Sequence, residues 1–401
     1  MHVRSRSHRT GSRRAMRAGG AATAALLLAM VPPAGAQALP PGGARFTPPP
    51  PTPNDTLVSP DVGADGRITL RLYAPMAKSV SVTGEFIPFG APPLALTRQA
   101  DGVWTGITGP IQPGAYRYAF VMDRVSIVDP KNRLTSTSAR QVQSLVVVSK
   151  DDVAADRPGV PHGAVAEVLY ASPRLAIERR MHVYTPPGYG RDGRTYPVLY
   201  LLHGGGDSDD SWPTVGRAGI ILDNLIASGQ ALPMVVVMPD GSVQPSGQPM
   251  TADERQDPFT TDLKTAIMPF VEANYRVSKR PEDTALAGLS MGGIQTLNIG
   301  LTSTDRFRWI GVFSSGWFPN DLAAFEQRHG SELEADTRRL RLFYYTNGSD
   351  DIALPNAKNV YAMLDRHHAR YEAHETPGGH TWINWRRNLS QFAPRLFRPA
   401  K

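Results

Sequence analysis

The stretch Thr284-Ala285-Leu286-Ala287-Gly288-Leu289-Ser290-Met291-Gly292-Gly293 decides the fold that we expect for this chain. An apolar run, a Gly-x-Ser-x-Gly motif and a helix-forming stretch as far as Leu301 together predict a strand, a tight turn and a helix. Glycines at both ends of the motif let the backbone of such a turn approach itself closely. The hypothesis is that Ser290 is a catalytic nucleophile, with the helix N-terminus at Met291 favouring negative charge beside it.

The composition excludes several kinds of site. The 401 residues, 41% of them hydrophobic, suffice for one large core and a smaller domain. Cysteine is absent, which excludes thiol catalysis, cysteine metal sites and disulfides. Six arginines and no acidic residue fall in the first twenty positions, and elsewhere 37 basic residues face 36 acidic ones. The net charge of +7 therefore indicates a targeting segment, and we expect no nucleic-acid partner.

The N-terminus has the regions of a secretory signal peptide. An apolar stretch from Ala18 to Val31 follows the basic region and precedes the small residues Ala34-Gly35-Ala36. The apolar stretch is too short for a membrane span, so we expect no stable membrane anchor. Arg13-Arg14 after Ser12 also allows a twin-arginine signal. Residues 1–36 are thus predicted to be a cleaved signal peptide of a secreted or periplasmic protein.

The rest of the chain divides into four segments. Residues 37–56 are rich in proline and predict an extended linker. Residues 57–148 hold short alternating runs between Gly and Pro clusters, which predict a small antiparallel β-sandwich. Residues 149–164 are polar and predict a second linker. Residues 165–396 alternate between strand-like and helix-like runs, which predicts an α/β fold with a mostly parallel sheet covered by helices on both faces.

Seven strands and five helices are expected in the last segment. The expected strands are Met181 to Tyr184, Val198 to Leu202, Met234 to Met238, Thr284 to Ala287, Trp309 to Phe313, Leu340 to Tyr345 and Tyr371 to Thr376. The expected helices are Ile220 to Ser228, Thr261 to Ala273, Ile294 to Thr302, Asn356 to His368 and Ile383 to Phe392. In such sheets ligands bind at the carboxyl ends of the strands.

Two residues that follow later strands complete a candidate catalytic group. A serine hydroxyl is a weak nucleophile unless a base takes its proton and a third group orients that base. Asp351 follows the strand from Leu340, and His380 lies on a glycine loop after the last strand. The order Ser, Asp, His is that of the α/β-hydrolases. The neighbouring Asp350 leaves open which carboxylate holds His380.

A glycine loop offers donors for an oxyanion. The buried-strand pattern from Val198 runs into His203-Gly204-Gly205-Gly206. Main-chain amides of Gly205 and Gly206, together with that of Met291, are the candidates for the oxyanion hole. His203 itself is expected to order this loop through hydrogen bonds.

The C-terminal segment resembles the Putative esterase family between Val165 and Phe392. The motifs that carry the resemblance are Tyr184 to Tyr189, Tyr196 to Gly204, Pro269 to Val277, the Ser290 turn, and Gly379 to Arg386. The family includes feruloyl and acetyl esterases of xylan breakdown, enterochelin esterases, S-formylglutathione hydrolases and mycolyltransferases. The resemblance implies an α/β-hydrolase fold with Ser290, Asp351 and His380 as the triad. Asp351 is preferred because Gly348-x-x-Asp351 matches the family spacing.

The predicted β-sandwich resembles the immunoglobulin-like early-set modules, which precede glycan-active enzymes and some esterases. The motifs that carry this resemblance are Leu72 to Pro75, Gly102 to Trp104, Pro113 to Tyr118, and Asp129-Pro130. Trp104, Tyr116 and Tyr118 are candidates for a sugar-stacking surface, although aromatic residues on strands more often pack in a core.

The remaining candidates concern ligands. Trp212 and Trp382 are candidate substrate-binding residues that line an acyl or sugar pocket, or else pack in the interior. The acidic run Asp207-Ser208-Asp209-Asp210 lacks the spacing of a calcium loop and is interpreted as a solvated turn. The sequence indicates no metal and no cofactor.

The leading functional hypothesis is an exported serine ester hydrolase that acts through an acyl-enzyme on feruloyl or acetyl esters of xylan. The second is an enterochelin esterase that opens a siderophore trilactone, which the neutral charge of the mature chain does not favour. A hypothesis of another class is a carbohydrate-binding protein without catalysis. Transfer of the acyl group to an alcohol would use the same acyl-enzyme as hydrolysis.

Overall fold

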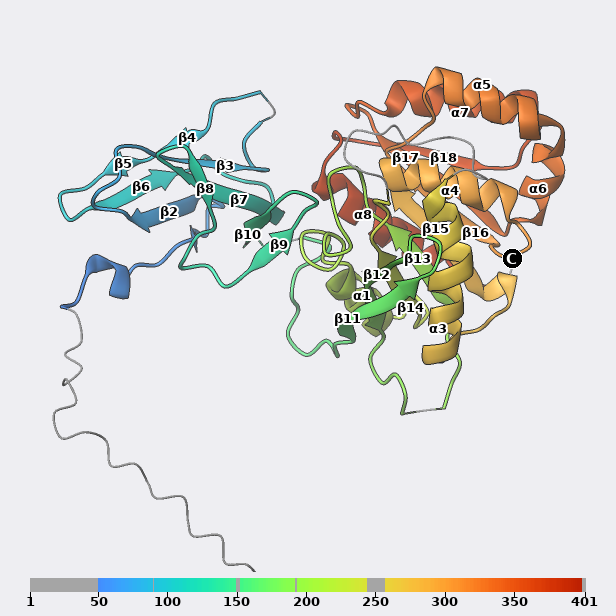
Figure 1. Ribbon diagram of the computed structural model, residues 1–401, viewed down its shortest axis with the longest axis horizontal. Coiled ribbons are helices and arrows are strands. Elements are labelled where there is room, and N and C mark those ends of the chain that lie inside the picture. Colours follow the sequence, from blue (N-terminus) through green and yellow to red (C-terminus); the bar gives the residue numbers. More distant parts are fainter. Residues whose placement is uncertain (1–49, 89, 149–151, 192, 244–256, 399–401) are drawn as a thin grey trace, which may run out of the picture. The chain divides into compact units, whose positions relative to one another are not determined.

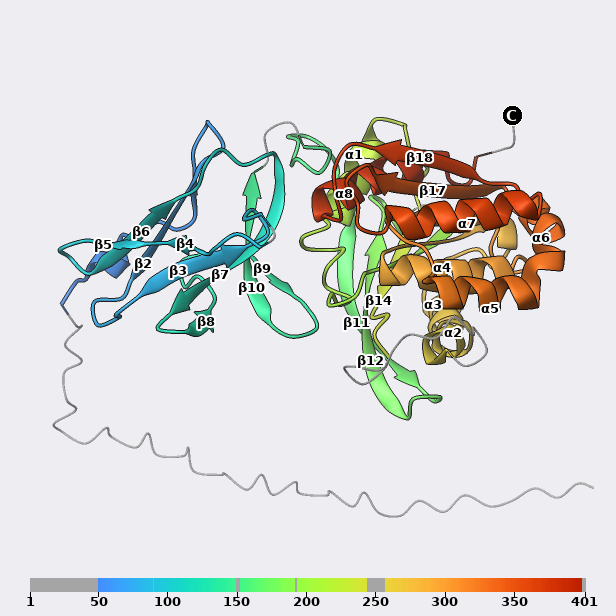
Figure 2. The same ribbon diagram turned by 90° about the horizontal axis from the view of Figure 1, so that it is seen from above.

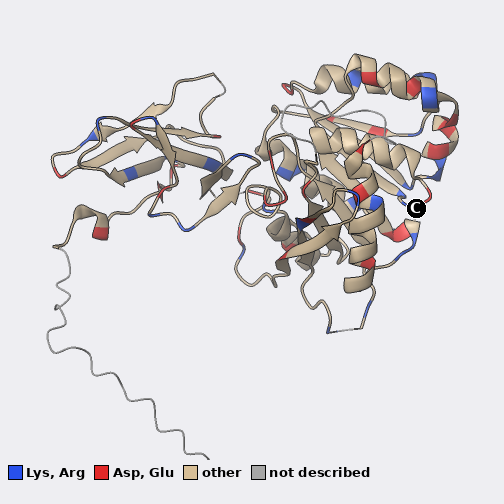
Figure 3. Cartoon of the chain, viewed as in Figure 1, with Lys and Arg blue, Asp and Glu red and all other residues tan. Residues whose placement is uncertain are grey.

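The computed structural model describes residues 50–88, 90–148, 152–191, 193–243 and 257–398. The predicted signal peptide and most of the proline-rich linker lie outside the described residues. Residues 51–401 form one compact unit. None of the helices in the described ranges is both long and apolar enough to cross a membrane. Basic and acidic residues are interspersed over this unit, as the near balance of charge outside the N-terminus requires (Figure 3).

Residues 57–148 form two antiparallel sheets, which we call the all-β module (Figure 1). One sheet has the order β1 (Asp61–Val62), β2 (Ile68–Tyr73), β6 (Val103–Ile107) and β5 (Thr97–Arg98). The other has the order β4 (Leu94–Ala95), β3 (Val80–Gly84), β7 (Gly114–Met122), β10 (Val142–Val148) and β9 (Thr135–Thr137), with β8 (Val125–Ile127) paired to β7. Side chains of both sheets, among them Leu70 and Phe120, meet in one hydrophobic cluster. Alternation of apolar and polar residues thus produced the predicted two-layer β structure.

The C-terminal part is built on an eight-stranded sheet with the order β11, β12, β14, β13, β15, β16, β17, β18. Its strands are β11 (Ala164–Ser172), β12 (Ile177–Thr185), β13 (Val198–Leu202), β14 (Val235–Pro239), β15 (Thr284–Leu289), β16 (Trp309–Phe313), β17 (Leu342–Gly348) and β18 (Glu372–Thr376). The pairs β11–β12 and β12–β14 are antiparallel, and the other pairs are parallel. The prediction of a mostly parallel sheet is therefore confirmed.

Helices cover both faces of this sheet (Figure 2). On one face lie α1 (Ala218–Ala227) and α8 (Trp382–Phe392). On the other lie α2 (Pro258–Asp262), α3 (Met268–Asn274), α4 (Met291–Thr302), α5 (Pro319–His329), α6 (Leu333–Arg339) and α7 (Leu354–Arg366). In β13, Val198, Tyr200 and Leu202 join one hydrophobic cluster, whereas Leu199 and Leu201 join the other. A fully apolar strand is what a sheet buried on both faces requires.

Shorter helices complete the chain. A π-helical segment, η2 (Leu263–Ile267), joins α2 to α3, so the single helix expected over Thr261 to Ala273 has three parts. The 3₁₀ turns are η1 (Pro53–Asp55), η3 (Pro281–Asp283), η4 (Gly330–Glu332) and η5 (Ala393–Arg395).

The sequence pattern missed three elements. The edge strand β11 was not predicted and is mostly exposed, although it contains the apolar run Val168-Leu169-Tyr170-Ala171. The helices α5 and α6 lie between the strands expected at Trp309 to Phe313 and Leu340 to Tyr345, where no helix was predicted, and each buries only two residues.

The described part of the predicted linker, residues 152–163, contains no helix or strand and makes contacts with the C-terminal part. Ala154 is buried in a hydrophobic cluster, and its carbonyl accepts a hydrogen bond from Arg217. Asp152 forms an ion pair with the buried Arg386, at 3.5 Å. The linker is therefore held against the C-terminal part at these two points.

Candidate active site

Ser290 occupies a strained turn between β15 and α4. Its backbone has φ 50° and ψ −115°, a conformation that non-glycine residues rarely adopt. The Ser290 amide donates to Phe313 O on β16, at 2.9 Å, and Ser315 Oγ donates to Ser290 O, at 2.6 Å. These contacts hold the strained residue in place from the neighbouring strand.

The two motif glycines are required by close backbone contacts. A Cβ atom at Gly288 would lie 2.3 Å from Gly292 O, and one at Gly292 would lie 2.5 Å from His203 O. The Gly292 amide also donates to His203 O, at 3.1 Å. The turn thus leaves no room for a side chain, and it is tied to the end of β13.

Gly288→Ala should destabilise the fold strongly because its methyl group would meet backbone that cannot move aside. We expect a loss of about 1–3 kcal/mol or more in the free energy of unfolding, measured by urea titration. Gly109→Ala is the matched control, since a Cβ there meets no atom within 4 Å. It should change stability by less than about 0.5 kcal/mol. Equal losses in both variants would contradict the steric argument.

The structure brings the three predicted catalytic side chains together. His380 Nε2 lies 3.0 Å from Ser290 Oγ, and His380 Nδ1 lies 2.8 Å from Asp351 Oδ1. The Asp351 side chain is fully buried, whereas that of His380 is 22% exposed. The histidine can therefore accept the serine proton while its other nitrogen donates to the carboxylate.

The carboxylate that faces His380 is Asp351 and not Asp350. The Asp350 side chain is exposed and contacts only its neighbour Ser349 in the hydrogen bonds of the described residues. Burial alone would raise the pKa of Asp351, but hydrogen bonds from His380 and from the Ala353 amide outweigh it and lower that pKa. Asp351 is thus held as an anion beside the imidazole.

The glycine loop after β13 passes beside the nucleophile. A Cβ at Gly204 would lie 3.2 Å from Ser290 Cβ, and one at Gly205 would lie 3.9 Å from Met291 Cβ. Met291 is the first residue of α4, where main-chain amides have no partner within the helix. Gly205 and Met291 therefore lie next to each other beside the serine, as the predicted oxyanion hole requires.

Gly206 lies in the turn of this loop. It has φ +82° within a turn closed by the Asp207 amide, which donates to Gly204 O at 3.2 Å. Its carbonyl accepts a hydrogen bond from the Ala139 amide of the all-β module, at 3.1 Å. These contacts involve the carbonyl of Gly206, so its amide stays a predicted oxyanion donor beside that of Gly205.

His203 orders the glycine loop from behind. It is 1% exposed, and its Nδ1 donates to Gly204 O at 2.8 Å. Its Nε2 lies 2.9 Å from the Gly241 amide nitrogen and 3.1 Å from Asp240 Oδ1. Burial lowers the pKa of His203, but the Asp240 carboxylate outweighs burial and raises it. Such a residue supports the loop and does not reach the serine.

The predicted substrate-binding tryptophans lie in the interior. Trp212 is 1% exposed, and its indole nitrogen donates to Leu202 O at 3.0 Å. Trp382 is 5% exposed and packs edge-on against Trp212, with 5.1 Å between ring centroids. The prediction that they line a ligand pocket is therefore wrong, because their faces are used in packing.

The sugar-stacking surface on the all-β module is also contradicted. Trp104, Tyr116 and Tyr118 are buried, at 8%, 4% and 0% exposure. Tyr118 donates to the buried Asp129 at 2.7 Å, and Tyr116 donates to Gln112 O at 2.6 Å. These rings form the core of the module and present no platform.

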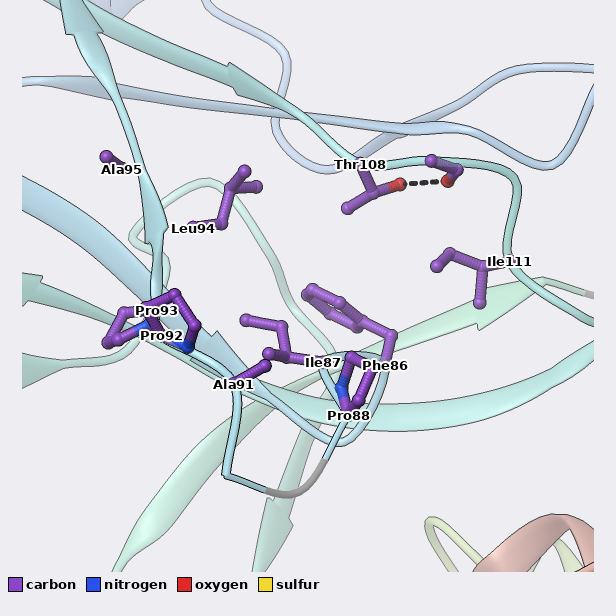
Figure 4. Close-up of a pocket in the computed structure, with 11 residues that line it drawn as sticks. Phe86, Ile87, Pro88, Ala91, Pro92, Pro93, Leu94, Ala95, Thr108 and Ile111 are labelled. Carbon is purple, nitrogen blue, oxygen red and sulfur yellow. Dashed lines mark hydrogen bonds between the residues drawn. The ribbon is translucent and has the colours of Figure 1, made fainter.

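The all-β module does carry a hollow of about 420 Å³ between the Phe86 to Ala95 loop and the Thr108 to Ile111 segment (Figure 4). Its described lining is apolar apart from Thr108, whose hydroxyl donates to Gly109 O at 2.7 Å. A lining with no titratable side chain among the described residues offers no chemistry.

The acidic run after the glycine loop is not solvated, which corrects the prediction. Asp207 and Asp209 are 7% and 3% exposed. Asp209 pairs with Arg180 and His182, at 2.8 and 2.9 Å. Asp207 pairs with Arg117 of the all-β module, at 2.7 Å.

The sequence analysis assigned no role to Arg117. This residue lies within the run Tyr116 to Phe120, which is buried throughout. A charged side chain in a buried run is a signal that it has a partner.

Residues 172–396 match the model of a family described as "Putative esterase". Over 350 residues the chain is 31% identical to an endo-1,4-beta-xylanase/feruloyl esterase of Xylanibacter ruminicola. The matched region covers 84% of this chain and 46% of that protein. The chain thus spans less than half the length of this relative.

Two solved structures share the fold. A ferulic acid esterase from Anaeromyces mucronatus, solved with ferulic acid, is 26% identical with a TM-score of 0.51 over 62% of this chain and 95% of that one. The enterobactin esterase of Shigella flexneri is 21% identical with a TM-score of 0.61 over 82% of this chain and 92% of that one.

Proposed function

Because the chain belongs to the Putative esterase family, we propose that it is a serine carboxylic-ester hydrolase that forms an acyl-enzyme on Ser290. The observation that carries the proposal is the hydrogen-bonded series Ser290 Oγ, His380 and Asp351, at 3.0 and 2.8 Å. A serine, a histidine and a carboxylate in this order suffice to transfer an acyl group to and from the serine.

In the acylation step, Ser290 Oγ attacks the ester carbonyl carbon and its proton moves to His380 Nε2. The resulting imidazolium is stabilised by Asp351, which accepts the hydrogen bond from Nδ1. When the tetrahedral intermediate collapses, the bond to the alcohol oxygen breaks and His380 gives its proton to that oxygen. The acyl group is then covalently bound to Ser290.

In the deacylation step, His380 takes a proton from water as the water oxygen attacks the acyl carbon. The second tetrahedral intermediate releases the carboxylic acid, and the proton on His380 returns to Ser290 Oγ. An alcohol in place of water would give a new ester by the same route. In both steps the oxyanion is assigned to the amides of Met291 and Gly205, and loss of one such donor typically costs about 10²–10³ in rate.

We propose a feruloyl ester of plant xylan as the leading substrate class. Sequence identity to a xylanase/feruloyl esterase supports it. Phe318 and Ile352, at 60% and 81% exposure, follow β16 and β17 at the carboxyl ends of the strands, the edge that also carries Ser290. Exposed apolar side chains on this edge suit an aromatic acyl group. An acetyl group would gain little from them.

A siderophore trilactone is the second candidate. What favours it is that the structural likeness to an enterobactin esterase extends over 82% of this chain.

Export through the predicted signal peptide is part of the proposal and is supported by the basic and apolar regions before Ala36. The early-set, immunoglobulin-like identity of the all-β module is likewise proposed, on the support of its two antiparallel sheets around one core.

The test compares methyl ferulate, acetylated xylan and enterobactin as substrates for the wild type and for Ser290→Ala. We expect methyl ferulate to give the highest kcat/KM and the variant to show no turnover. Preference for enterobactin would replace the xylan assignment, and xylan binding without turnover would favour a carbohydrate-binding protein. Turnover by Ser290→Ala at the wild-type rate would contradict the acyl-enzyme. Added alcohols with product analysis separate transfer from hydrolysis.

A further inference from the structure

A buried cation of the all-β module, Arg117, reaches the catalytic loops. Arg117, on β7, has a side chain that is 5% exposed. Its Nε donates to Glu85 Oε1 of the same module at 2.9 Å, and its Nη2 donates to Asp207 Oδ1 at 2.7 Å. Its guanidinium carbon also lies 5.8 Å from the centre of the Trp382 ring, two residues after His380. One side chain thus contacts the segments that follow β13 and β18.

Asp207 transmits this contact to the glycine loop. Its amide closes the turn by donating to Gly204 O, and its Oδ2 lies 3.7 Å from the position of a Cβ on Gly204. Gly204 in turn lies against Ser290. The direction in which the Gly205 amide points therefore depends on where the Asp207 carboxylate is held.

Further contacts from β9 and its following loop support the same turn. The Ala139 amide donates to Gly206 O, and Ser208 Oγ donates to Thr137 O at 2.8 Å. The Thr137 amide donates to Asp210 Oδ2. Main-chain groups of the module therefore fix the loop at several points, while Arg117 supplies the only cation bonded to Asp207 in the described part of the chain.

The charge of Arg117 is secure in this setting. Burial lowers the pKa of Arg117, but the carboxylates of Glu85 and Asp207 outweigh burial and raise it. A guanidinium can bond two carboxylates at once through its fork of donors, which an ammonium group cannot do with the same geometry. One guanidinium therefore bonds Glu85 of the module and Asp207 of the glycine loop at the same time.

On the basis of the proposed function, we propose that Arg117 is a positioning residue for ester hydrolysis: anchored by Glu85, it fixes Asp207 and thereby orients the oxyanion amide of Gly205. The all-β module is then a part of the catalytic unit. Catalysis should accordingly depend on a residue 90 positions before its partner in the sequence.

The test measures kcat and KM on methyl ferulate for Arg117→Met, Asp207→Asn and the double variant. The double variant is needed because removal of one partner leaves an unpaired buried charge that can unfold the protein. We expect kcat to fall about 10- to 100-fold in each, with KM within about threefold, because a displaced donor weakens the transition state more than the ground state. The double variant should lose no more than either single one, since the two residues act as a unit.

Two further measurements separate positioning from general damage. The rate at which a p-nitrophenyl phosphonate ester labels Ser290 should fall by a factor similar to that of kcat, since its adduct also needs the oxyanion donors. Arg117→Lys should recover part of kcat, because a lysine can bond Asp207 but not both carboxylates. Arg71→Met removes a half-buried arginine of the same module, paired with Asp61 at 3.3 Å, and should leave kcat unchanged.

An unchanged kcat in the folded double variant would overturn the inference, as would a loss of kcat that only tracks the fraction unfolded. In both cases the proposed function would stand, since the wild type would hydrolyse the ester. A wild-type protein that hydrolyses no ester and takes no phosphonate would overturn the proposed function and this inference together.

Discussion

Replacing His380 by alanine should lower kcat by about 10⁴- to 10⁶-fold, the largest loss that we expect from any single side chain apart from Ser290. Without the imidazole at 3.0 Å, Ser290 Oγ has no base to take its proton, and the leaving alcohol has no acid. Residual turnover would come from the oxyanion amides and from substrate binding alone. The measurement is single-substrate kinetics on methyl ferulate.

Two comparisons make this prediction specific. The double variant Ser290→Ala/His380→Ala should be no more than about tenfold slower than either single one, because the two side chains act in one proton transfer. His374→Ala, an exposed histidine whose Nε2 is 3.6 Å from Glu372, should keep wild-type activity. If His380→Ala retained kcat within about tenfold, the base would have to be another group.

Asp351→Asn should lower kcat by about 10³- to 10⁴-fold, whereas Asp350→Asn should change it less than about threefold. An asparagine can present its NH₂ group to His380 Nδ1, which favours the imidazole tautomer with the proton on Nε2, unable to accept from Ser290. The Asp350 side chain is exposed, and among the described residues it accepts a hydrogen bond only from Ser349, so its charge has no such role. Equal losses in both variants would contradict the assignment.

The Asp351 carboxylate should also make the free energy of unfolding depend on pH in the acid range. The pKa of Asp351 in the folded protein lies below its ordinary value, because hydrogen bonds to the carboxylate outweigh its burial. Its contribution to the free energy of unfolding is therefore complete above the ordinary carboxyl pKa and is lost as the pH falls through the lower folded value. Acidification below about pH 4 should then destabilise the wild type more than Asp351→Asn.

Local pattern predicted most of the fold because the strands and helices of the C-terminal part bury regular stripes. The run Val198 to Leu202 is apolar at every position, as a strand covered on both faces must be. Slightly buried elements gave mixed results: the exposed strand β18 was predicted, whereas the exposed edge strand β11 and the helix α5, which buries only Leu322 and Phe325, were missed. Elements stabilised by few apolar contacts leave little periodicity in the sequence.

The nucleophile Ser290, its base His380 and the orienting carboxylate Asp351 could be predicted because each follows a strand. Parallel strands bring their carboxyl ends to one edge of the sheet. The choice between Asp350 and Asp351 needed either the family spacing or the structure, since the two differ in orientation and not in position along the chain. Whether Trp212 and Trp382 line a ligand pocket or pack in the interior was not predictable, because an aromatic ring next to a catalytic loop suits both.

The sequence by itself predicted the nucleophile turn, because the close approach of Gly288 to Gly292 O lies within five residues, although Gly292 also needs the space beside His203 O. It also determined the sheet, through the apolar strands that alternate with helices. Only the tertiary structure decided that Asp207 is buried against Arg117 and that the predicted linker is packed. The reason is physical: the free energy of a buried charge depends on a partner far away in the sequence, and no local pattern specifies which one folding brings within 2.7 Å.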